Sequence, residues 1–183
     1  MNEKEAISAI LNYLNKSIED YKINKIDLEN KTHYIQIDNF NFHIKELTWK
    51  DFLNIEMKSY ISIDGNIFYD KSIEKKLTLD ISVLSVNEDK FIYKNLPSDI
   101  IEKLWEEYQQ YLHLSLEEID FLYKCSKNYF SDKNAENFPL HPLILEVDYM
   151  TKGIVHYSKS EFENLSTREF EAIQLILSTK NEI

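Results

Sequence analysis

The sequence is poor in the residues on which many known sites depend. Its 183 residues include only two glycines, Gly65 and Gly153, together with three prolines, one cysteine and one arginine. Glycine-rich phosphate loops and dinucleotide-binding fingerprints need several glycines at fixed spacing, and two isolated glycines cannot supply them. The scarcity of glycine therefore excludes the commonest nucleotide-dependent enzymes.

Cys125 is the only cysteine, so the chain can form neither an internal disulfide nor a thiolate metal cluster. No apolar run reaches the roughly 20 residues of a membrane-spanning helix. The first residues carry acidic side chains in an amphipathic pattern, which is unlike a secretory signal. We therefore expect a soluble protein of the cytoplasm, with no membrane partner.

Acidic residues outnumber basic ones by 32 to 21, and the net charge of −11 is spread along the chain. No block of Lys or Arg could neutralise a nucleic-acid backbone, so nucleic acid is not an expected partner. We interpret the acidity first as a solvated surface. Attraction to a basic partner is the functional alternative.

Apolar periodicity predicts an amphipathic helix over about 3–20, followed by a β-hairpin. The stretch "HYIQIDNFNFHIKEL" alternates apolar and polar residues around Asp38 and Asn39, which tolerate a tight turn. A two-residue loop would place Ile37 opposite Phe40 and leave one apolar face to be buried. His33 and His43 are then expected near each other at the open end of the hairpin.

A helix is expected to follow the hairpin directly, with Thr48 as its N-cap. Its apolar face would carry Trp49, Phe52, Leu53 and Tyr60, the first three packing the helix against the hairpin. A turn is expected at "IDGN", around Gly65. The next segment, 72–86, fits both a helix and a strand, and we favour the helix.

Capping residues predict the remaining helices. Ser98 is expected to cap a helix after Pro97, and Ser115 with Glu118 forms a capping box for the next one. Two further boxes are expected near the end of the chain, and these are Ser160 with Glu163 and Ser166 with Glu169.

These elements predict an α+β fold that is mainly α, with a small N-terminal β-hairpin packed against a helical bundle and a C-terminal helical extension. Residues 1–130 would form the N-terminal helix, hairpin and helical core. A polar, asparagine-rich linker is expected at 131–142, where Pro139 and Pro142 disfavour helix. Residues 143–183 would form the extension and end in a helix.

The reactive residues of the sequence form no recognisable catalytic pattern, and we predict no catalytic residue, metal site or cofactor. The five histidines lack the spacing of a metal-binding pair, and the adjacent carboxylates lie on solvated helix faces. The serines occur mainly at caps, where capping accounts for them. A lone helical cysteine such as Cys125 is most often a small buried residue.

Aromatic residues are abundant, with twelve Tyr, ten Phe and two Trp. Large amphipathic rings favour protein interfaces because they bury area while keeping a polar group available. Core packing is the alternative explanation for rings at helical spacing, and Tyr111 is the best interface candidate. The candidate protein-binding residues are Trp49, Phe52, Trp105, Tyr108 and Tyr111.

The order of three motifs resembles the tail assembly chaperones of tailed bacteriophages and, more loosely, small phage baseplate assembly proteins. The motifs are "FHIKELTWKDFLNIE", "SIEKKLTLDISVLSV" and "LPSDIIEKLWEEYQQYL", within approximately Ile35 to Tyr129. The resemblance implies a mainly helical, nonenzymatic protein of the host cytoplasm. It would bind tape-measure, tail-tube or baseplate proteins during virion assembly and prevent their premature aggregation. The segment "SEFENLSTREFEAI" would belong to an extension that recruits a tail component.

Two alternative functions stay open. The first is a permanent virion subunit, such as a baseplate or connector component, and the second is an enzyme whose site leaves no readable motif. Homo-oligomerisation is compatible with either. If the protein is an assembly chaperone, an exposed apolar patch rimmed by acids is expected on its surface.

Overall fold

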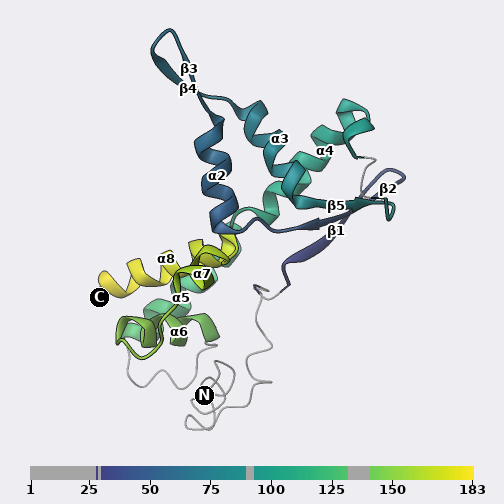
Figure 1. The fold of residues 1–183 in the computed structure, drawn as a ribbon. Helices are drawn as coiled ribbons and strands as arrows, with labels where there is room; N and C mark the ends of the chain where they lie inside the picture. Colours follow the sequence, from purple (N-terminus) through teal and green to yellow (C-terminus); the bar gives the residue numbers. More distant parts are fainter. Residues whose placement is uncertain (1–27, 29, 90–92, 132–140) are drawn as a thin grey trace. The chain divides into compact units, whose positions relative to one another are not determined.

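The computed structural model describes residues 28, 30–89, 93–131 and 141–183. The described chain is α+β and mainly α, as predicted (Figure 1). The helix expected over 3–20 and most of the expected linker at 131–142 lie outside the described residues. The strands are β1 (Thr32–Ile37), β2 (Phe40–Lys45), β3 (Tyr60–Ile63), β4 (Asn66–Tyr69) and β5 (Val83–Val86). The α-helices are α2 (Trp49–Ser59), α3 (Lys71–Ser82), α4 (Ser98–Tyr108), α5 (Leu116–Ser131), α6 (Pro142–Thr151), α7 (Lys159–Glu163) and α8 (Thr167–Asn181), with short 3-10 helices at Tyr93–Asn95 and Gln109–Tyr111.

The chain divides into two compact units that differ from the linear division predicted at 131–142. The sheet unit contains Leu28–His113 and also Ser158–Phe170, whereas the helical unit contains Leu114–Tyr157 and Glu171–Ile183. The expected C-terminal extension is therefore not one body. Its segment 158–170 packs with residues 46–49, between β2 and the start of α2, which precede it by more than a hundred residues.

The predicted hairpin is confirmed in its register. Strands β1 and β2 pair antiparallel with Ile37 opposite Phe40 and Ile35 opposite Phe42, around a turn in which Asp38 has φ +50°. One face is buried. His33 lies opposite Ile44, and His43 lies opposite Tyr34. Since side chains alternate between the faces of a strand, His33 and His43 point to opposite sides of the sheet, so their expected proximity was wrong.

The segment with two competing periodicities is a helix followed by a strand. Asp70 caps α3 by accepting a hydrogen bond from the Ser72 backbone N–H at 2.8 Å. The helix ends at Ser82, and β5 then pairs with β2 as the third strand of the sheet. The favoured helix is thus correct up to Ser82. Beyond it Val83 takes the extended conformation, which suits a β-branched residue beside an open strand edge.

A continuous core lies between the sheet and helices α3 and α4. Its fully buried side chains are Phe42, Ile44, Leu47, Leu79, Val86, Leu104 and Tyr108. Inside it, the Tyr108 hydroxyl donates to the Lys45 carbonyl at 2.9 Å and contacts the Ser82 hydroxyl at 2.7 Å. Because both partners are buried polar groups, Tyr108 satisfies hydrogen bonds that the core would otherwise leave unmade.

The predicted caps are correct at three places and wrong at two. Thr48 accepts from Asp51 N–H, and the boxes Ser115 with Glu118 and Ser166 with Glu169 form both of their hydrogen bonds. The box expected from Ser160 and Glu163 does not form. Helix α7 begins two residues earlier than expected, and Ser158 and Glu161 form its capping box. Ser98 is the first residue of α4 and makes no capping hydrogen bond, since Pro97 occupies the N-cap.

The corner between β2 and α2 packs against the segment that joins α7 to α8. Trp49 N–H donates to the Leu165 carbonyl at 2.7 Å, and Thr167 N–H donates to the Leu47 carbonyl at 3.1 Å. The Trp49 ring stacks on Phe170, with ring centroids 3.8 Å apart. The expected packing of Trp49 against the hairpin was therefore wrong in its partner, which comes from a distant part of the chain.

A buried ion pair lies at the same corner. The Arg168 guanidinium donates to the Glu46 carboxylate at 3.1 Å, and both side chains are more than nine-tenths buried. The His33 ring contacts the same carboxylate oxygen at 3.0 Å and stacks on Tyr111 at 4.1 Å. The only arginine of the sequence thus joins the end of β2 to the start of α8.

In the helical unit, three helices meet at the buried carboxylate of Asp148 on α6. It accepts from Tyr129 of α5 at 2.9 Å, from Lys152 at 2.5 Å and from Lys180 of α8 at 2.8 Å. Pro142 was expected to lie in the linker, but it is the first residue of α6, a position where its missing N–H costs nothing. No described helix is long and apolar enough to cross a membrane.

We expect Arg168→Met to lower the free energy of unfolding by about 3–5 kcal/mol, because it leaves the Glu46 carboxylate buried without its arginine partner. Chemical denaturation measures the loss. The matched control is Lys50→Met, since Lys50 pairs with Glu163 between the same two segments but at the surface. An equal loss in both variants would contradict a special role for the buried pair.

We expect Asp148→Asn to destabilise the helical unit by about 1–3 kcal/mol at neutral pH. Burial alone would raise the pKa of Asp148, but hydrogen bonds from Lys152, Lys180 and Tyr129 outweigh it and hold that pKa below its ordinary value. The stabilisation is therefore present above the ordinary pKa and is lost as the pH falls through the lowered one. Thermal unfolding from pH 7 to pH 2 should show the two proteins converging in acid, whereas the exposed Asp120→Asn should change little.

Candidate protein-binding surface

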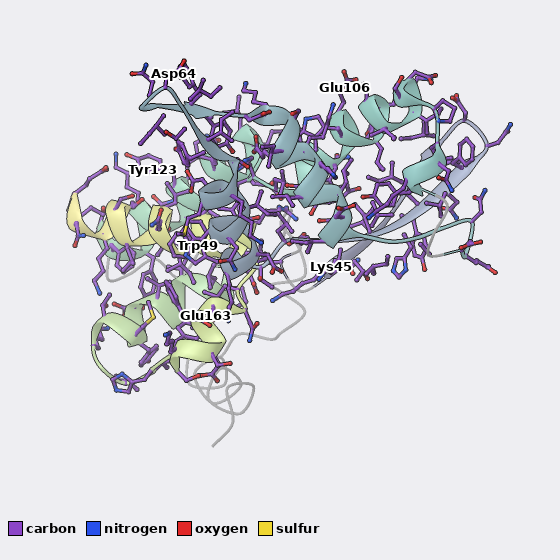
Figure 2. The ribbon with its side chains drawn as sticks, turned by 45° about the horizontal axis from the view of Figure 1, so that its top comes forward. Lys45, Trp49, Asp64, Glu106, Tyr123 and Glu163 are labelled. Atoms are coloured by element: carbon purple, nitrogen blue, oxygen red, sulfur yellow. The ribbon has the colours of Figure 1, made fainter. Side chains whose placement is uncertain are left out.

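Strands β3 and β4 form a two-stranded ribbon, Tyr60–Tyr69 (Figure 1), in which every residue is exposed except the partly buried Ile61. Tyr60 pairs with Tyr69, Ile61 with Phe68 and Ile63 with Asn66. The turn consists of Asp64 at φ +51° and Gly65 at φ +81°, the positive values that a tight two-residue hairpin requires. Asp64 marks the tip of the ribbon, which extends beyond the ends of α2 and α3 (Figure 2).

Apolar side chains of the ribbon are exposed on both of its faces. Ile67 is 74% exposed and shares a face with Tyr60 and Tyr69, whereas Phe68 and Ile63 lie on the other face and are half exposed. A sheet of a globular protein normally buries at least one apolar face. Exposed apolar residues of this density make the ribbon the candidate binding surface of the sheet unit.

The base of the ribbon is ordered by contacts with α2. The backbone N–H of Asp70 donates to the carbonyl of the buried Ser59 at 2.8 Å, and the rings of Tyr60 and Tyr69 meet edge to face at 5.1 Å. Burial raises the pKa of Tyr69 to about 12, and the nearby carboxylates of Glu74 and Glu56 add to the effect. Acids thus adjoin the apolar surface at its base, as Asp64 does at its tip.

The aromatic residues proposed from sequence for α4 contribute to the core instead. Tyr108 is fully buried, and Trp105 and Tyr111 are partly buried against the same core. Tyr111, the preferred interface candidate, stacks on His33. These rings are explained by packing, which was the alternative considered for them.

The two aromatic candidates of α2 also pack within the sheet unit. Trp49 lies between Phe52 and Phe170, with its ring stacked on both. Phe52 meets the His113 ring edge to face. Both side chains are partly buried, so most of their apolar area is already used. Tyr60, which was placed on the same helical face, is instead the first residue of β3.

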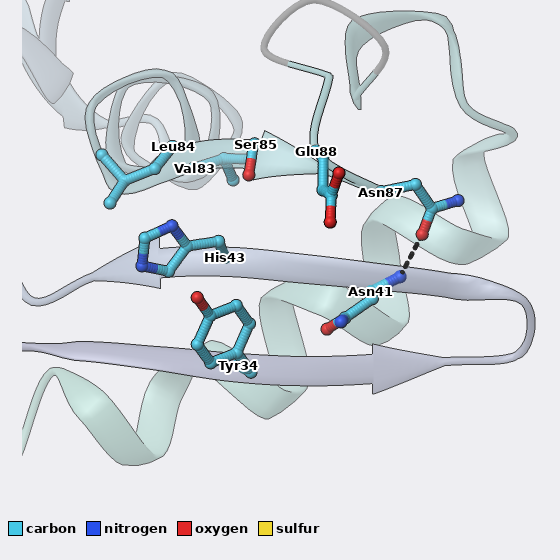
Figure 3. A pocket seen from close by; sticks show the side chains of 8 residues that line it. All are labelled: Tyr34, Asn41, His43, Val83, Leu84, Ser85, Asn87 and Glu88. Carbon is cyan, nitrogen blue, oxygen red and sulfur yellow. Dashed lines mark hydrogen bonds between the residues drawn. The ribbon is translucent and has the colours of Figure 1, made fainter.

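A groove on the outer face of the three-stranded sheet is the second candidate site (Figure 3). Tyr34 and His43 project from neighbouring strands and stack at 4.6 Å. The backbone N–H of Asn41 donates to the side-chain oxygen of Asn87 at 2.8 Å, and the Asn87 side-chain NH2 group donates to the Asn39 carbonyl at 3.4 Å. The groove is open, and its lining includes a base, a hydroxyl and an acid in His43, Ser85 and Glu88 (Figure 3). Among the described residues no hydrogen bond joins these three side chains into a catalytic arrangement, so we treat the ribbon as the stronger candidate.

Other reactive groups of the described chain are dispersed or buried. No three His, Cys, Asp or Glu side chains among the described residues lie close enough to hold a metal ion. Cys125 is buried, as expected, and burial raises the pKa of its thiol, which reduces the fraction of reactive thiolate.

Sequence reasoning missed the ribbon, although a signal was present. The stretch "YISIDGNIFY" places Asp64-Gly65 between residues of high β propensity, which is a strong hairpin signal. It was interpreted only as a turn because Tyr60 also continued the spacing of the preceding helix. The apolar residues of the ribbon were therefore not considered as a surface.

No protein-family model matches the chain, and neither the curated proteins nor the solved structures contain a significant match.

We expect Gly65→Val to loosen the ribbon without unfolding the sheet unit. A Cβ at Gly65 would meet no atom within 4 Å, so the cost is the backbone strain of a β-branched residue at positive φ, about 1–2 kcal/mol. Hydrogen exchange should be faster at residues 60–69 while the global unfolding transition changes little. Ser62→Thr on the same ribbon is the control, and unchanged exchange in Gly65→Val would contradict the turn geometry.

Proposed function

We propose that this chain is a nonenzymatic phage assembly protein of the tail assembly chaperone kind, and that the ribbon is its partner-binding surface. The observation that carries the proposal is the exposure of Ile67, Phe68, Tyr60 and Tyr69 on a projecting element. An exposed apolar patch adjoined by acids is the surface expected of a protein that covers apolar segments of a partner.

The resemblance supplies the class of partner. A tape-measure, tail-tube or baseplate protein carries apolar segments that become buried only when the tail assembles. The ribbon would cover such a segment until then and release it to its final neighbour. Release requires a small contact of moderate affinity, which suits an element of only ten residues.

Gene order gives the first test. A large tape-measure-like reading frame next to the coding sequence supports the proposal and names the partner to be used. If all flanking genes are unrelated to tails, the phage assignment is wrong.

Co-expression with that partner tests the surface. We expect the wild-type chain to co-purify with the tail protein, and Ile67→Thr/Phe68→Thr to reduce the recovered partner at least about tenfold, equivalent to a loss of ~1.4 kcal/mol. Threonine keeps the β propensity of both positions. The matched control is Leu116→Thr/Ile154→Thr, which removes two exposed apolar side chains outside the ribbon.

Three results would contradict this proposal. If the ribbon variant and the control variant lose the same amount of recovered partner, binding is nonspecific apolar contact. If the wild-type chain co-purifies with no tail protein, the proposed function is wrong. Detection of the chain in purified mature particles would favour the alternative of a permanent virion subunit.

A further inference from the structure

The ribbon has open edges as well as open faces. Within the described chain β3 pairs only with β4, so each strand has one edge along which no strand is hydrogen-bonded. Isolated two-stranded ribbons are marginally stable, and an exposed apolar edge without proline readily accepts a further strand. An extended segment that pairs with one of these edges would also cover an apolar face.

Charge around the ribbon favours a basic segment. Between residues 56 and 76 the chain carries four acids, Glu56, Asp64, Asp70 and Glu74, and four lysines, Lys58, Lys71, Lys75 and Lys76, and all four lysines lie in α2 or α3. Asp64 lies exposed at the tip, and Glu56 and Glu74 act on Tyr69 at the base. The ribbon itself carries one charged side chain, Asp64, which has the same sign as the net charge of −11.

A second copy of this chain fits the surface poorly. Two copies would bring like charges together at the ribbon and over the whole molecule. A standard protein interface also uses roughly 20–30 residues a side, whereas the ribbon provides ten. An added strand, by contrast, obtains affinity from main-chain hydrogen bonds along one edge, so a small element is sufficient.

We infer that the ribbon binds, by strand addition, an extended apolar segment of a partner protein that is flanked by lysine or arginine. This inference rests on the proposed function and specifies the part of the partner that is recognised. Alternate side chains of the segment would cover Ile67, Tyr60 and Tyr69, while its basic flanks would lie near Asp64 and near Glu56 and Glu74.

Peptides test the inference directly on the full chain. The probe is a peptide of about ten residues, the upper length of ordinary strands, that alternates valine and threonine between terminal lysines. One comparison peptide has terminal glutamates, and another is N-methylated at alternate backbone amides, which removes strand hydrogen bonds but keeps the side chains. Fluorescence anisotropy at low and high salt gives each dissociation constant.

We expect the lysine-flanked peptide to bind at least about tenfold more tightly than the glutamate-flanked one and to weaken with salt. The N-methylated peptide should lose binding. Equal affinity for the two flanks would overturn the basic requirement, and undiminished binding of the N-methylated peptide would overturn strand addition.

Charge-neutralising variants provide a matched comparison, with three carboxylates removed in each. The ribbon variant is Glu56→Gln/Asp64→Asn/Glu74→Gln, and the control is Glu106→Gln/Glu107→Gln/Glu117→Gln on exposed helix surfaces. Asp70 is left intact because it caps α3, and asparagine at 64 suits the turn. We expect the ribbon variant to weaken binding of the lysine-flanked peptide several-fold more than the control variant does. Equal effects of the two variants would overturn the inference.

The two proposals fail in different ways. If no peptide binds while the wild-type chain still co-purifies with its tail protein through Ile67 and Phe68, recognition of a basic strand is wrong and the protein-binding function stands. If the tail protein does not co-purify either, the function itself is wrong.

Discussion

The sheet unit depends on the burial of one ion pair, Glu46 with Arg168. A buried carboxylate is stable only with a cation and hydrogen bonds around it. Here Arg168 supplies the cation from a segment more than a hundred residues later, and His33 contacts the same carboxylate oxygen at 3.0 Å. Forming the pair brings Leu165, Thr167 and Phe170 onto the corner between β2 and α2. The corner sets the direction of α2, and α2 carries the ribbon at its end.

This arrangement separates the aromatic residues into two populations. Trp49, Trp105, Tyr108 and Tyr111 pack around the core and the corner, where their polar atoms find partners or the edge of the unit. In the ribbon, Tyr60 and Tyr69 meet edge to face and Tyr69 also interacts with Glu74 and Ser59, but Tyr60, Phe68 and Tyr69 all remain exposed. A chain that placed all of its rings in the core would need no such ribbon. The ribbon is therefore the feature that packing alone does not explain.

An assembly function is consistent with this separation. In the core, the buried hydroxyls of Tyr108 and Ser82 are hydrogen-bonded to each other, and in the groove on the outer sheet face the rings of Tyr34 and His43 stack. Binding through an exposed β ribbon needs no reactive side chain, only main-chain hydrogen bonds and apolar area. Acids around the apolar residues would then favour apolar segments that have basic flanks. Repulsion between the same acids would also disfavour pairing between the ribbons of two copies.

The sequence by itself determined the local elements. Alternation around Asp38 and Asn39 specifies the hairpin and its register, and Thr48, Ser115 with Glu118, and Ser166 with Glu169 specify helix starts, because these signals act between residues a few positions apart. The tertiary structure alone decided which segments meet. Neither the partner of Trp49 nor the burial of Arg168 with Glu46 follows from local spacing, whereas the separation of His33 from His43 follows from the hairpin register. The end of α3 at Ser82 and the exposure of β3 and β4 depend likewise on whether a neighbouring strand or core is present. Long-range packing makes that choice, and local propensity does not encode it.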